Sequence, residues 1–461
     1  MSSPIENAIE YAQAHRDSFL EGYQELLSIP SISTDPTYKA ELERCADWIV
    51  AEMTRIGLKN SRKMPTTGHP VIYGEWLEAG GDKPTVVIYA HYDVQPVDPL
   101  NLWETPPFEP SVRDGKLYAR GSADNKSGIW GNLKTLESIL ATEGRLPVNV
   151  KVFFEGEEET GSPSAAPFVV AHKDLLAADA LMMSDSGFDP DHPMIGYTAR
   201  GIISAEVTVR GPDHDLHSGG YGGVVHNPLH TVGKIIASFH DDRGRIQIPG
   251  YYDEVRELDE EERAQLLETY KITGPEFEAK SGVEHFWGES IAPVPVRATS
   301  LPTLDVNGIS GGYQGPGMKT VIPSEASFKV TMRLVPNQDP AKIAELFKNY
   351  VESFASDTMQ VSVAIHEKAW PVTMAGDGPS LEAVQRGYED MIGRRALRVR
   401  VGGSIPILGM FQREMGMPIT PLGYGSGENV HSPNEYVRLD HFFLSIEKSI
   451  RTFYYLAETM G

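Results

Sequence analysis

The chain has 461 residues, of which 40% are apolar and 23% charged, the composition of a globular protein long enough for two domains. Its 64 acidic residues outnumber the 41 basic ones, and the formal charge is -23. Because such a surface repels nucleic-acid phosphates and anionic membranes, we expect neither as a partner and favour a small molecule or peptide as the substrate.

The N-terminal residues 1–19 carry scattered charges and lack the apolar core of a signal peptide. No later segment reaches the ~18 apolar residues of a membrane-spanning helix. Cys45 is the only cysteine, which excludes an intramolecular disulfide and fits a reducing compartment. We therefore expect a cytoplasmic protein, with Cys45 buried in a helix near 39–57.

The first 200 residues alternate between helices and short apolar strands. We predict helices near 5–28, 39–57, 127–142 and 164–175, and strands at 85–90 ("TVVIYA"), 148–154 ("VNVKVFF") and 180–184 ("ALMMS"). This alternation is typical of a largely parallel sheet covered by helices on both faces. In such sheets ligands bind at the carboxyl ends of the strands.

The pattern changes near residue 201. The stretches "ISAEVTVRG" and "EASFKVTMRLV" alternate apolar and polar residues, as strands with one solvated face do, and helices are predicted near 227–240 and 340–355. An irregular piece, 243–320, contains the acidic helical run "DEEERAQLLETY". Because α/β texture resumes after "AGDGPS", we predict a catalytic domain formed by 1–200 and 375–461, with an inserted α+β domain at 201–374.

Polar residues follow the predicted strands. His91 and Asp93 ("HYD") come after 85–90, four glutamates ("EGEEETGS") follow 148–154, and Asp185 ("SDSG") follows the third strand. Asp124 lies in "RGSADNKSG" and His431 in "GYGSGENVHSPNE". Taken singly, these residues are ordinary helix caps, turn formers and loop residues.

Taken together, they place two histidines and several carboxylates at one edge of an α/β sheet. Clustered carboxylates repel one another, and a bound cation is the usual remedy. Imidazole with carboxylate, and no thiolate, suits Zn²⁺, with Mn²⁺ or Co²⁺ as alternatives. The acidic run is therefore interpreted as part of a metal site.

The ordered motifs "HYD", "GSADNKSG", "EGEEETGS", "SDSG", "DLHSG" and "VHSPNE" resemble the M20 family of co-catalytic dinuclear metallopeptidases, nearest its dipeptidase and carnosinase-like branch, over nearly the whole chain. The resemblance implies a zinc-peptidase-like three-layer catalytic domain with a mainly parallel sheet and an inserted lid and dimerisation domain. It implies two divalent ions bridged by Asp124. His91 and Asp185 would complete one metal site, and Glu158 and His431 the other.

By the same resemblance, a metal-activated bridging water attacks the peptide bond of a dipeptide, with Glu157 as general base and acid. Asp93 would accept the ring N–H of His91 and fix its tautomer. Glu155 and Glu159 have no such role and are expected to be solvated. The family also implies a cis peptide bond between Asp124 and Asn125.

The resemblance further implies a homodimer. His217 of "DLHSG" would reach from the partner subunit to stabilise the oxyanion, and Thr320, also in trans, would join Arg333 and Ser404 in binding the terminal carboxylate of the substrate. Without the resemblance, a surface-loop histidine and an interdomain salt bridge would be the ordinary interpretations of His217 and Arg333.

Other activities stay open on the same fold. An N-acyl amino acid amidohydrolase (deacylase) or a carboxypeptidase would keep the metal residues, although the aspartate at position 185 favours a dipeptidase, because deacylases and carboxypeptidases of the family tend to have glutamate there. An M28-type aminopeptidase would lack the motifs of the inserted domain. A non-catalytic metal- or peptide-binding homologue is disfavoured because Glu157, Asp124 and His431 are all present.

Overall fold

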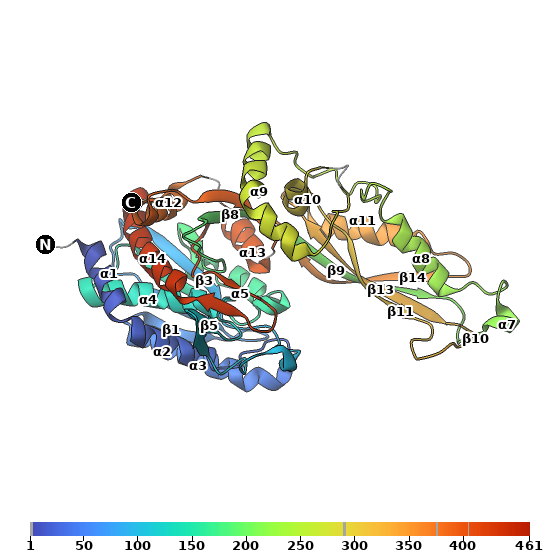
Figure 1. Ribbon diagram of the computed structural model, residues 1–461, viewed down its shortest axis with the longest axis horizontal. Helices are drawn as coiled ribbons and strands as arrows, with labels where there is room; N and C mark the ends of the chain where they lie inside the picture. Colours follow the sequence, from blue (N-terminus) through green and yellow to red (C-terminus); the bar gives the residue numbers. More distant parts are fainter. Residues whose placement is uncertain (1–2, 289–291, 375–376, 404) are drawn as a thin grey trace. The chain divides into compact units, whose positions relative to one another are not determined.

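The computed structural model describes residues 3–288, 292–374, 377–403 and 405–461 (Figure 1). The chain forms two compact units. The first unit contains residues 1–197, 374–398 and 407–461, and the second contains 198–373 and 399–406. The expected boundaries at 200 and 374 lie next to these divisions, but residues 399–406, expected in the catalytic domain, group with the second unit.

A six-stranded sheet forms the centre of the first unit. Its order is β1 (Lys59–Met64), β2 (Val71–Trp76), β6 (Asn149–Glu155), β3 (Thr85–His91), β7 (Ala180–Met183) and β17 (Ile419–Pro421). Strands β6, β3, β7 and β17 run parallel to one another, whereas β2 pairs antiparallel with both β1 and β6. The prediction of a mainly parallel sheet is confirmed.

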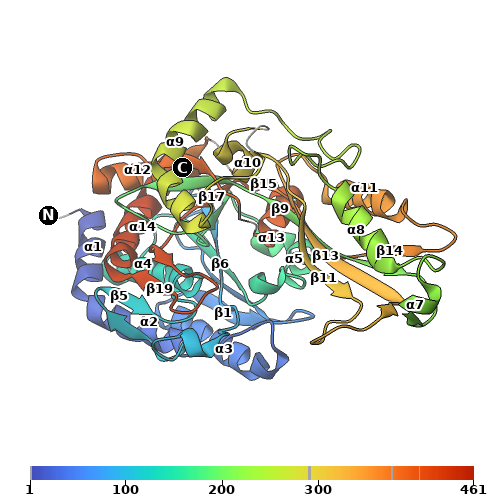
Figure 2. The same ribbon diagram turned by 45° about the vertical axis from the view of Figure 1, so that its right-hand side comes forward.

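Helices cover both faces of this sheet, as neighbouring side chains of β6 demonstrate. Phe154 packs into the large core shared with α1 (Pro4–Ala14), α2 (Arg16–Leu27), α3 (Lys39–Arg55), α4 (Lys126–Glu143), α12 (Pro379–Ile392) and α14 (Leu439–Thr459). Phe153 points to the opposite face, where its ring lies 6.0 Å from Phe168 of α5 (Ala165–Ala171) and 5.3 Å from Phe411 of α13 (Pro406–Met415). Figure 2 shows α1, α4 and α14 side by side on one face.

Smaller elements complete the first unit. They are η1 (Pro36–Tyr38), η2 (Leu100–Leu102), η3 (Glu158–Thr160), α6 (Lys173–Leu176), and a second sheet of β4 (Ser111–Arg113), β5 (Lys116–Tyr118), β19 (Tyr436–Arg438) and β18 (Gly427–Glu428). Two further strands, β8 (Met194–Ala199) and β16 (Leu397–Arg400), each cross a division between the units, and β15 (Val372–Thr373) pairs antiparallel with the part of β8 in the second unit. Cys45 is buried with a free thiol, as predicted. Among the helices described, none combines the length and the apolar character that crossing a bilayer requires.

The second unit contains an antiparallel sheet in the order β11 (Asp305–Gly311), β13 (Glu325–Leu334), β9 (Gly201–Arg210) and β14 (Gln360–Ala369). Residues of β9 and β13 alternate between buried and more exposed, as predicted, because α8 (Pro228–Ser238) and α11 (Pro340–Glu352) pack on one face. The acidic run at 259–270 begins α9 (Glu260–Ser281), and Asp259 caps that helix. The remaining elements are β10 (Leu216–His217), α7 (Ser218–Tyr221), α10 (Val294–Ser300) and β12 (Val321–Ile322).

The register of the main sheet brings the polar strand ends together. His91, the last residue of β3, lies opposite Glu155, the last residue of β6, and Tyr89 lies opposite Met183, the last residue of β7. Because these strands are parallel, the loops that follow them leave the sheet at the same edge. The segments with Asp93, Glu157 and Asp185 therefore start beside one another.

Candidate metal centre

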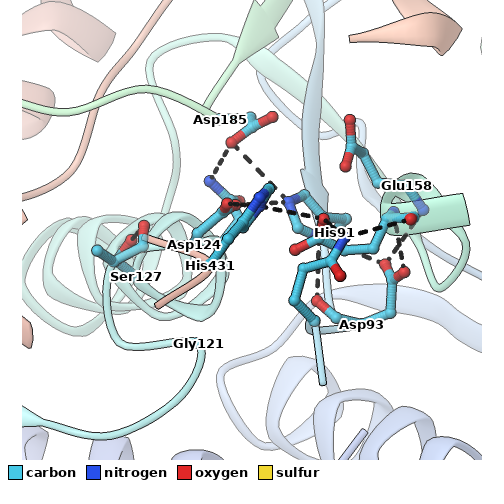
Figure 3. A network of polar contacts seen from close by, with 12 residues as sticks. His91, Asp93, Gly121, Asp124, Ser127, Glu158, Asp185 and His431 are labelled. Atoms are coloured by element: carbon cyan, nitrogen blue, oxygen red, sulfur yellow. Dashed lines mark hydrogen bonds and ion pairs between the residues drawn. The ribbon is translucent and has the colours of Figure 1, made fainter. Parts of the chain in front are cut away.

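His91, Asp124 and Asp185 form the first group of potential metal ligands. The buried His91 directs Nε2 toward Asp124 Oδ1 at 3.1 Å and toward Asp185 Oδ1 at 3.8 Å. Burial raises the pKa of Asp185 to about 7, and the charges of Asp124 and Glu159 add to this effect. Figure 3 shows these three side chains meeting at one place. A divalent cation would relieve the repulsion between the carboxylates.

Asp124 is shared with a second group, which also contains Glu159 and His431. Its other oxygen, Oδ2, lies 3.0 Å from His431 Nε2, and the same nitrogen is 3.3 Å from Glu159 Oε2. Burial alone would raise the pKa of Asp124, but its hydrogen bonds to His431 and His91 hold that pKa well below its usual range. One carboxylate therefore faces two histidines with separate oxygens, the arrangement that a ligand bridging two metals needs.

The glutamates after β6 differ from the sequence prediction by one position. Glu159, not Glu158, lies with Asp124 and His431. The Glu157 carboxylate is held elsewhere, because Oε1 accepts the His69 N–H and Oε2 accepts the Ser164 N–H, both at 2.9 Å. Glu158 stands between them in the sequence, and its pKa is raised well above its usual value by burial and by the charge of Asp185, against the opposing charge of His91.

The expectation that Glu155 and Glu159 are solvated is wrong. Glu155 is 1% exposed, and its Oε1 accepts hydrogen bonds from the Tyr89 and Ser162 hydroxyls. The Glu159 side chain is 4% exposed. The physical reason is the fold of the run: β6 carries Glu155 into the sheet edge, and the one-turn helix η3 then rotates Glu158 and Glu159 toward the neighbouring strand ends.

Asp93 connects the His91 side with the glutamate turn. Its Oδ1 is 3.3 Å from His91 Nδ1, the relation that the sequence predicts. Its two oxygens also accept the N–H groups of Glu158 (3.2 Å) and Glu159 (3.1 Å). Figure 3 places Asp93 beside His91, on the side away from Asp185. A single buried carboxylate therefore orients the imidazole and fixes the start of the turn.

The loop that carries Asp124 contains the expected cis peptide bond between Asp124 and Asn125. Asn125 Nδ2 donates to Asp185 Oδ1 at 3.0 Å and to the Ser184 carbonyl at 3.1 Å. Because Asn125 directly follows Asp124, it connects the candidate ligands Asp124 and Asp185. Glu435, four residues after His431, accepts the N–H groups of Ala123 and Asp124. Sequence reasoning assigned no role to Glu435, although it lies within the quoted motif "VHSPNE".

The remaining predicted residues belong to the second unit. His217 ends β10, and Thr320 directly precedes β12, the strand that pairs with β10. Their Nε2 and Oγ1 atoms are 3.5 Å apart, and both residues are exposed. Arg333 lies on β13, half buried. Ser404 lies outside the described residues.

Arg200 is a neighbour of Arg333 that sequence reasoning missed. Its Nε donates to the Gly402 carbonyl at 2.9 Å, within the "GGSIP" segment, while Nη1 is buried and lacks a hydrogen-bond partner among the described residues. Burial, followed by the charge of Arg333, lowers the pKa of Arg200 to about 10. The signal in the sequence was the arginine of "TARG", directly before β9. Two neighbouring guanidinium groups form a natural anion site.

A model of peptidase family M20/M25/M40 matches residues 87–459. The Cys-Gly metallodipeptidase dug1 of Schizosaccharomyces pombe is 30% identical over 97% of both chains, and the human Beta-Ala-His dipeptidase is 31% identical over 94% of this chain and 89% of its own. An M20 family metallo-carboxypeptidase from Sulfolobus solfataricus has a TM-score of 0.85 at 31% identity, covering 95% of this chain and 99% of its own. The chain therefore belongs to peptidase family M20/M25/M40 and is a metallopeptidase.

Proposed function

We propose that the protein hydrolyses dipeptides that have a free terminal carboxylate. The observation that carries this proposal is the Asp124 carboxylate, which faces a histidine and a second carboxylate on each side. Sequence relatives named as a Cys-Gly metallodipeptidase and a Beta-Ala-His dipeptidase, each matched over nearly the whole chain, support dipeptides as the substrate class.

Two divalent ions fit the donor set, which consists of imidazole and carboxylate groups. Burial, together with the charges of Asp124 and Glu159, raises the pKa of Asp185 in this set. We assign His91, Asp124 and Asp185 to one ion, and Asp124, Glu159 and His431 to the other, with Zn²⁺ as the expected metal and Mn²⁺ or Co²⁺ as alternatives. When bound, the two ions supply Lewis acidity and lower the pKa of a water molecule toward ~7. In this assignment Glu159 is the metal ligand, in place of Glu158, which the sequence predicted.

Glu158 then takes the role first predicted for Glu157. Its carboxylate lies next to both groups, and its raised pKa suits a residue that accepts a proton from the attacking water and returns it to the leaving amine. Glu157 is unsuited to this task, because both of its oxygens are engaged by backbone N–H groups. Asp93 contacts both the His91 ring and the backbone N–H of Glu158. It therefore orients the metal ligand His91 and the proton shuttle Glu158 at the same time.

Recognition of the terminal carboxylate is assigned to Arg333 together with Arg200 and Ser404. The buried Nη1 of Arg200 has no hydrogen-bond partner among the described residues, and burial and the charge of Arg333 lower the pKa of this guanidinium. A bound carboxylate would accept a hydrogen bond from Nη1 and offset the charge. This assignment predicts that dipeptides with a free terminal carboxylate are preferred over those without one.

We propose that the active protein is a homodimer in which His217 and Thr320 act in the site of the partner subunit. Both side chains are exposed and adjacent. The second unit also exposes large apolar residues, which mark an interaction surface: Tyr221, Val224, Ile309, Tyr313 and Met318. Val224 is 85% exposed and Met318 is 99% exposed. We place the dimer in the cytoplasm, where the free thiol of Cys45 fits the reducing conditions.

The test is to chelate the purified protein, restore Zn²⁺, Mn²⁺ or Co²⁺ singly, and measure amino-acid release from dipeptides and from matched N-acetyl amino acids. We expect metal-dependent cleavage of the dipeptides, and loss of cleavage in Glu158→Gln. A second candidate, carboxypeptidase activity, is favoured by the Sulfolobus solfataricus structure, so longer peptides belong in the panel. Cleavage of only the acylated compounds would contradict the proposal and indicate an amidohydrolase.

A further inference from the structure

A second cluster of histidine and aspartate side chains lies in the first unit, outside the metal centre. Asp189 and Asp191 belong to the loop after β7, and His441 lies in the first turn of α14. One potential ligand atom from each of the three residues lies within 4.8 Å of the other two. The functional site described above uses none of them.

The imidazole of His441 points into this cluster. The residue is 2% exposed. Its Nδ1 lies 2.5 Å from Ser426 Oγ and 3.9 Å from Asp189 Oδ1, and its Nε2 faces Asp191 and Asp440. Nε2 is 3.7 Å from Asp191 Oδ2 and 3.9 Å from Asp440 Oδ2, too far for a hydrogen bond. The separation resembles the 3.8 Å between His91 Nε2 and Asp185 Oδ1. Among the described residues Nε2 has only these longer contacts, and a cation placed between the atoms would bind the nitrogen and the carboxylates together.

The charges around the cluster also favour a cation. Three carboxylates, those of Asp189, Asp191 and Asp440, surround the His441 ring. The Arg438 guanidinium is committed to Asp440 at 2.9 Å and is 4.0 Å from Asp191, so it offsets only part of this charge. His192 contributes a fourth nearby donor, because its Nδ1 is 3.6 Å from Asp189 Oδ2.

We propose that Asp189, Asp191 and His441 form a separate site for a divalent cation of the Zn²⁺ or Mn²⁺ type. Imidazole with two carboxylates is a donor set that these ions accept, and the exposed side of Asp191 leaves room for water ligands. The site does not depend on the proposed function of the metal centre.

The position of the cluster indicates what such an ion would do. The segment that begins at Asp185 runs beside residues 424–425: Ser186 accepts the Tyr424 N–H at 3.1 Å, and Phe188 donates its N–H to Gly425 at 2.8 Å. One segment starts at a candidate ligand of the metal centre, and the other leads to His431. An ion held by Asp189, Asp191 and His441 would fasten the first segment to the start of α14, and the contact of His441 Nδ1 with Ser426 Oγ connects that helix to the second segment.

The test uses the full chain with Asp124→Asn as background, so that the metal centre is disabled. After chelation, the protein is loaded with Mn²⁺ or Zn²⁺, freed of excess ion by gel filtration, and its metal content is counted by mass spectrometry. Asp191→Asn is added in one sample, and Asp174→Asn, an exposed aspartate elsewhere in the first unit with the same change of charge, in a matched control. His441→Gln provides a second variant.

We expect the background and the Asp174→Asn control to retain one ion per chain that both Asp191→Asn and His441→Gln lose, with at least tenfold weaker binding. The test compares the metal content of the Asp191→Asn sample with that of its Asp174→Asn control. This difference is independent of how many ions the Asp124→Asn metal centre still binds, so it can be interpreted even if the proposed metal centre is wrong. An unchanged metal content in Asp191→Asn, or a background that binds no ion, would overturn the proposal and leave an ion-pair network centred on Arg438.

Discussion

Glu435 and Asp124 are joined by a hydrogen bond from the Asp124 N–H to Glu435 Oε1, 3.1 Å long. The same oxygen accepts the Ala123 N–H at 2.8 Å, while Oε2 accepts the Gly121 N–H and the Arg120 guanidinium. Glu435 is fully buried. The backbone of Asp124 is therefore fixed by a carboxylate that belongs to neither of the two groups of potential metal ligands.

Glu435→Gln is expected to loosen this loop, because an amide NH₂ replaces one of the two acceptors and leaves buried donors unpaired. Breaking a buried, hydrogen-bonded ion pair costs about 3 kcal/mol, so the free energy of unfolding of the metal-free protein should fall by that order. Denaturant unfolding measures this change, with Glu104→Gln, which removes an exposed pair with Arg113, as control. Equal stability of the two variants would contradict the role given to Glu435.

Glu157, Glu158 and Glu159 should be distinguishable by the effects of their substitution on kcat and on metal content. Glu158→Gln is expected to lower kcat by ~10²–10⁴ and keep both metals, because a proton shuttle is not a ligand. Glu159→Gln should lose one metal equivalent. Glu157→Gln should change neither as strongly, since its carboxylate binds backbone groups. Metal content and kcat, measured together, check all three, and loss of a metal in Glu158→Gln would restore the assignment first predicted from the sequence.

Arg200→Met should raise the KM of dipeptides by about 10–100-fold, the effect of losing a hydrogen bond to a charged group. The same variant should change little for dipeptide amides, which lack the terminal carboxylate. Arg210→Met, at the other end of β9 and exposed, is the matched control. A similar rise for amides and free acids would show that Arg200 acts on something other than the carboxylate.

The proposed action of His217 in trans makes a mixing experiment decisive. His217→Ala and Glu158→Gln should each be inactive. When the two are mixed and allowed to exchange subunits, half of the sites in a mixed dimer have both residues intact, so about a quarter of the wild-type activity should return. Release of amino acids from a dipeptide measures the recovery. A mixture that stays inactive after exchange, verified by mass, would place His217 in cis.

The burial of Lys448 leads to a prediction of how the free energy of unfolding depends on pH. Its Nζ donates to the Gly423 carbonyl at 2.8 Å and lies among the rings of Phe188, Tyr388 and Tyr424, and this burial lowers its pKa to about 7. The unfolded chain therefore holds a proton that the folded chain lacks between pH 7 and the ordinary lysine pKa of 10.5. Stability should rise with pH in this window, by about 1 kcal/mol per unit.

Lys448→Met should remove most of this rise, because methionine does not titrate and suits an apolar site. Unfolding free energies at pH 7 and pH 9, measured on metal-free protein, test the difference. Lys173→Met, which removes a partly exposed lysine paired with Glu414, should behave as wild type. A parallel pH dependence in the Lys448 variant would contradict the assignment.

The sequence predicted the features that rest on local pattern. The short apolar strands, the alternation of β9 and β13, and the position of polar residues at strand ends all follow from periodicity. It could not decide among Glu157, Glu158 and Glu159, because their roles depend on where η3 begins and how far it turns. Arg200 was missed for a different reason, since its link to Gly402 joins residues about 200 positions apart.

The division of the chain has a practical meaning for anyone who wishes to study the second unit alone. Residues 399–406 belong to it although they follow a stretch of the first unit, and Gly402 accepts a hydrogen bond from Arg200. A fragment cut at 198 and 373 would lack this returning segment and leave the Arg200 guanidinium without its carbonyl acceptor. The second unit therefore cannot be excised as one continuous segment. Exchanging it between relatives requires transferring both 198–373 and 399–406.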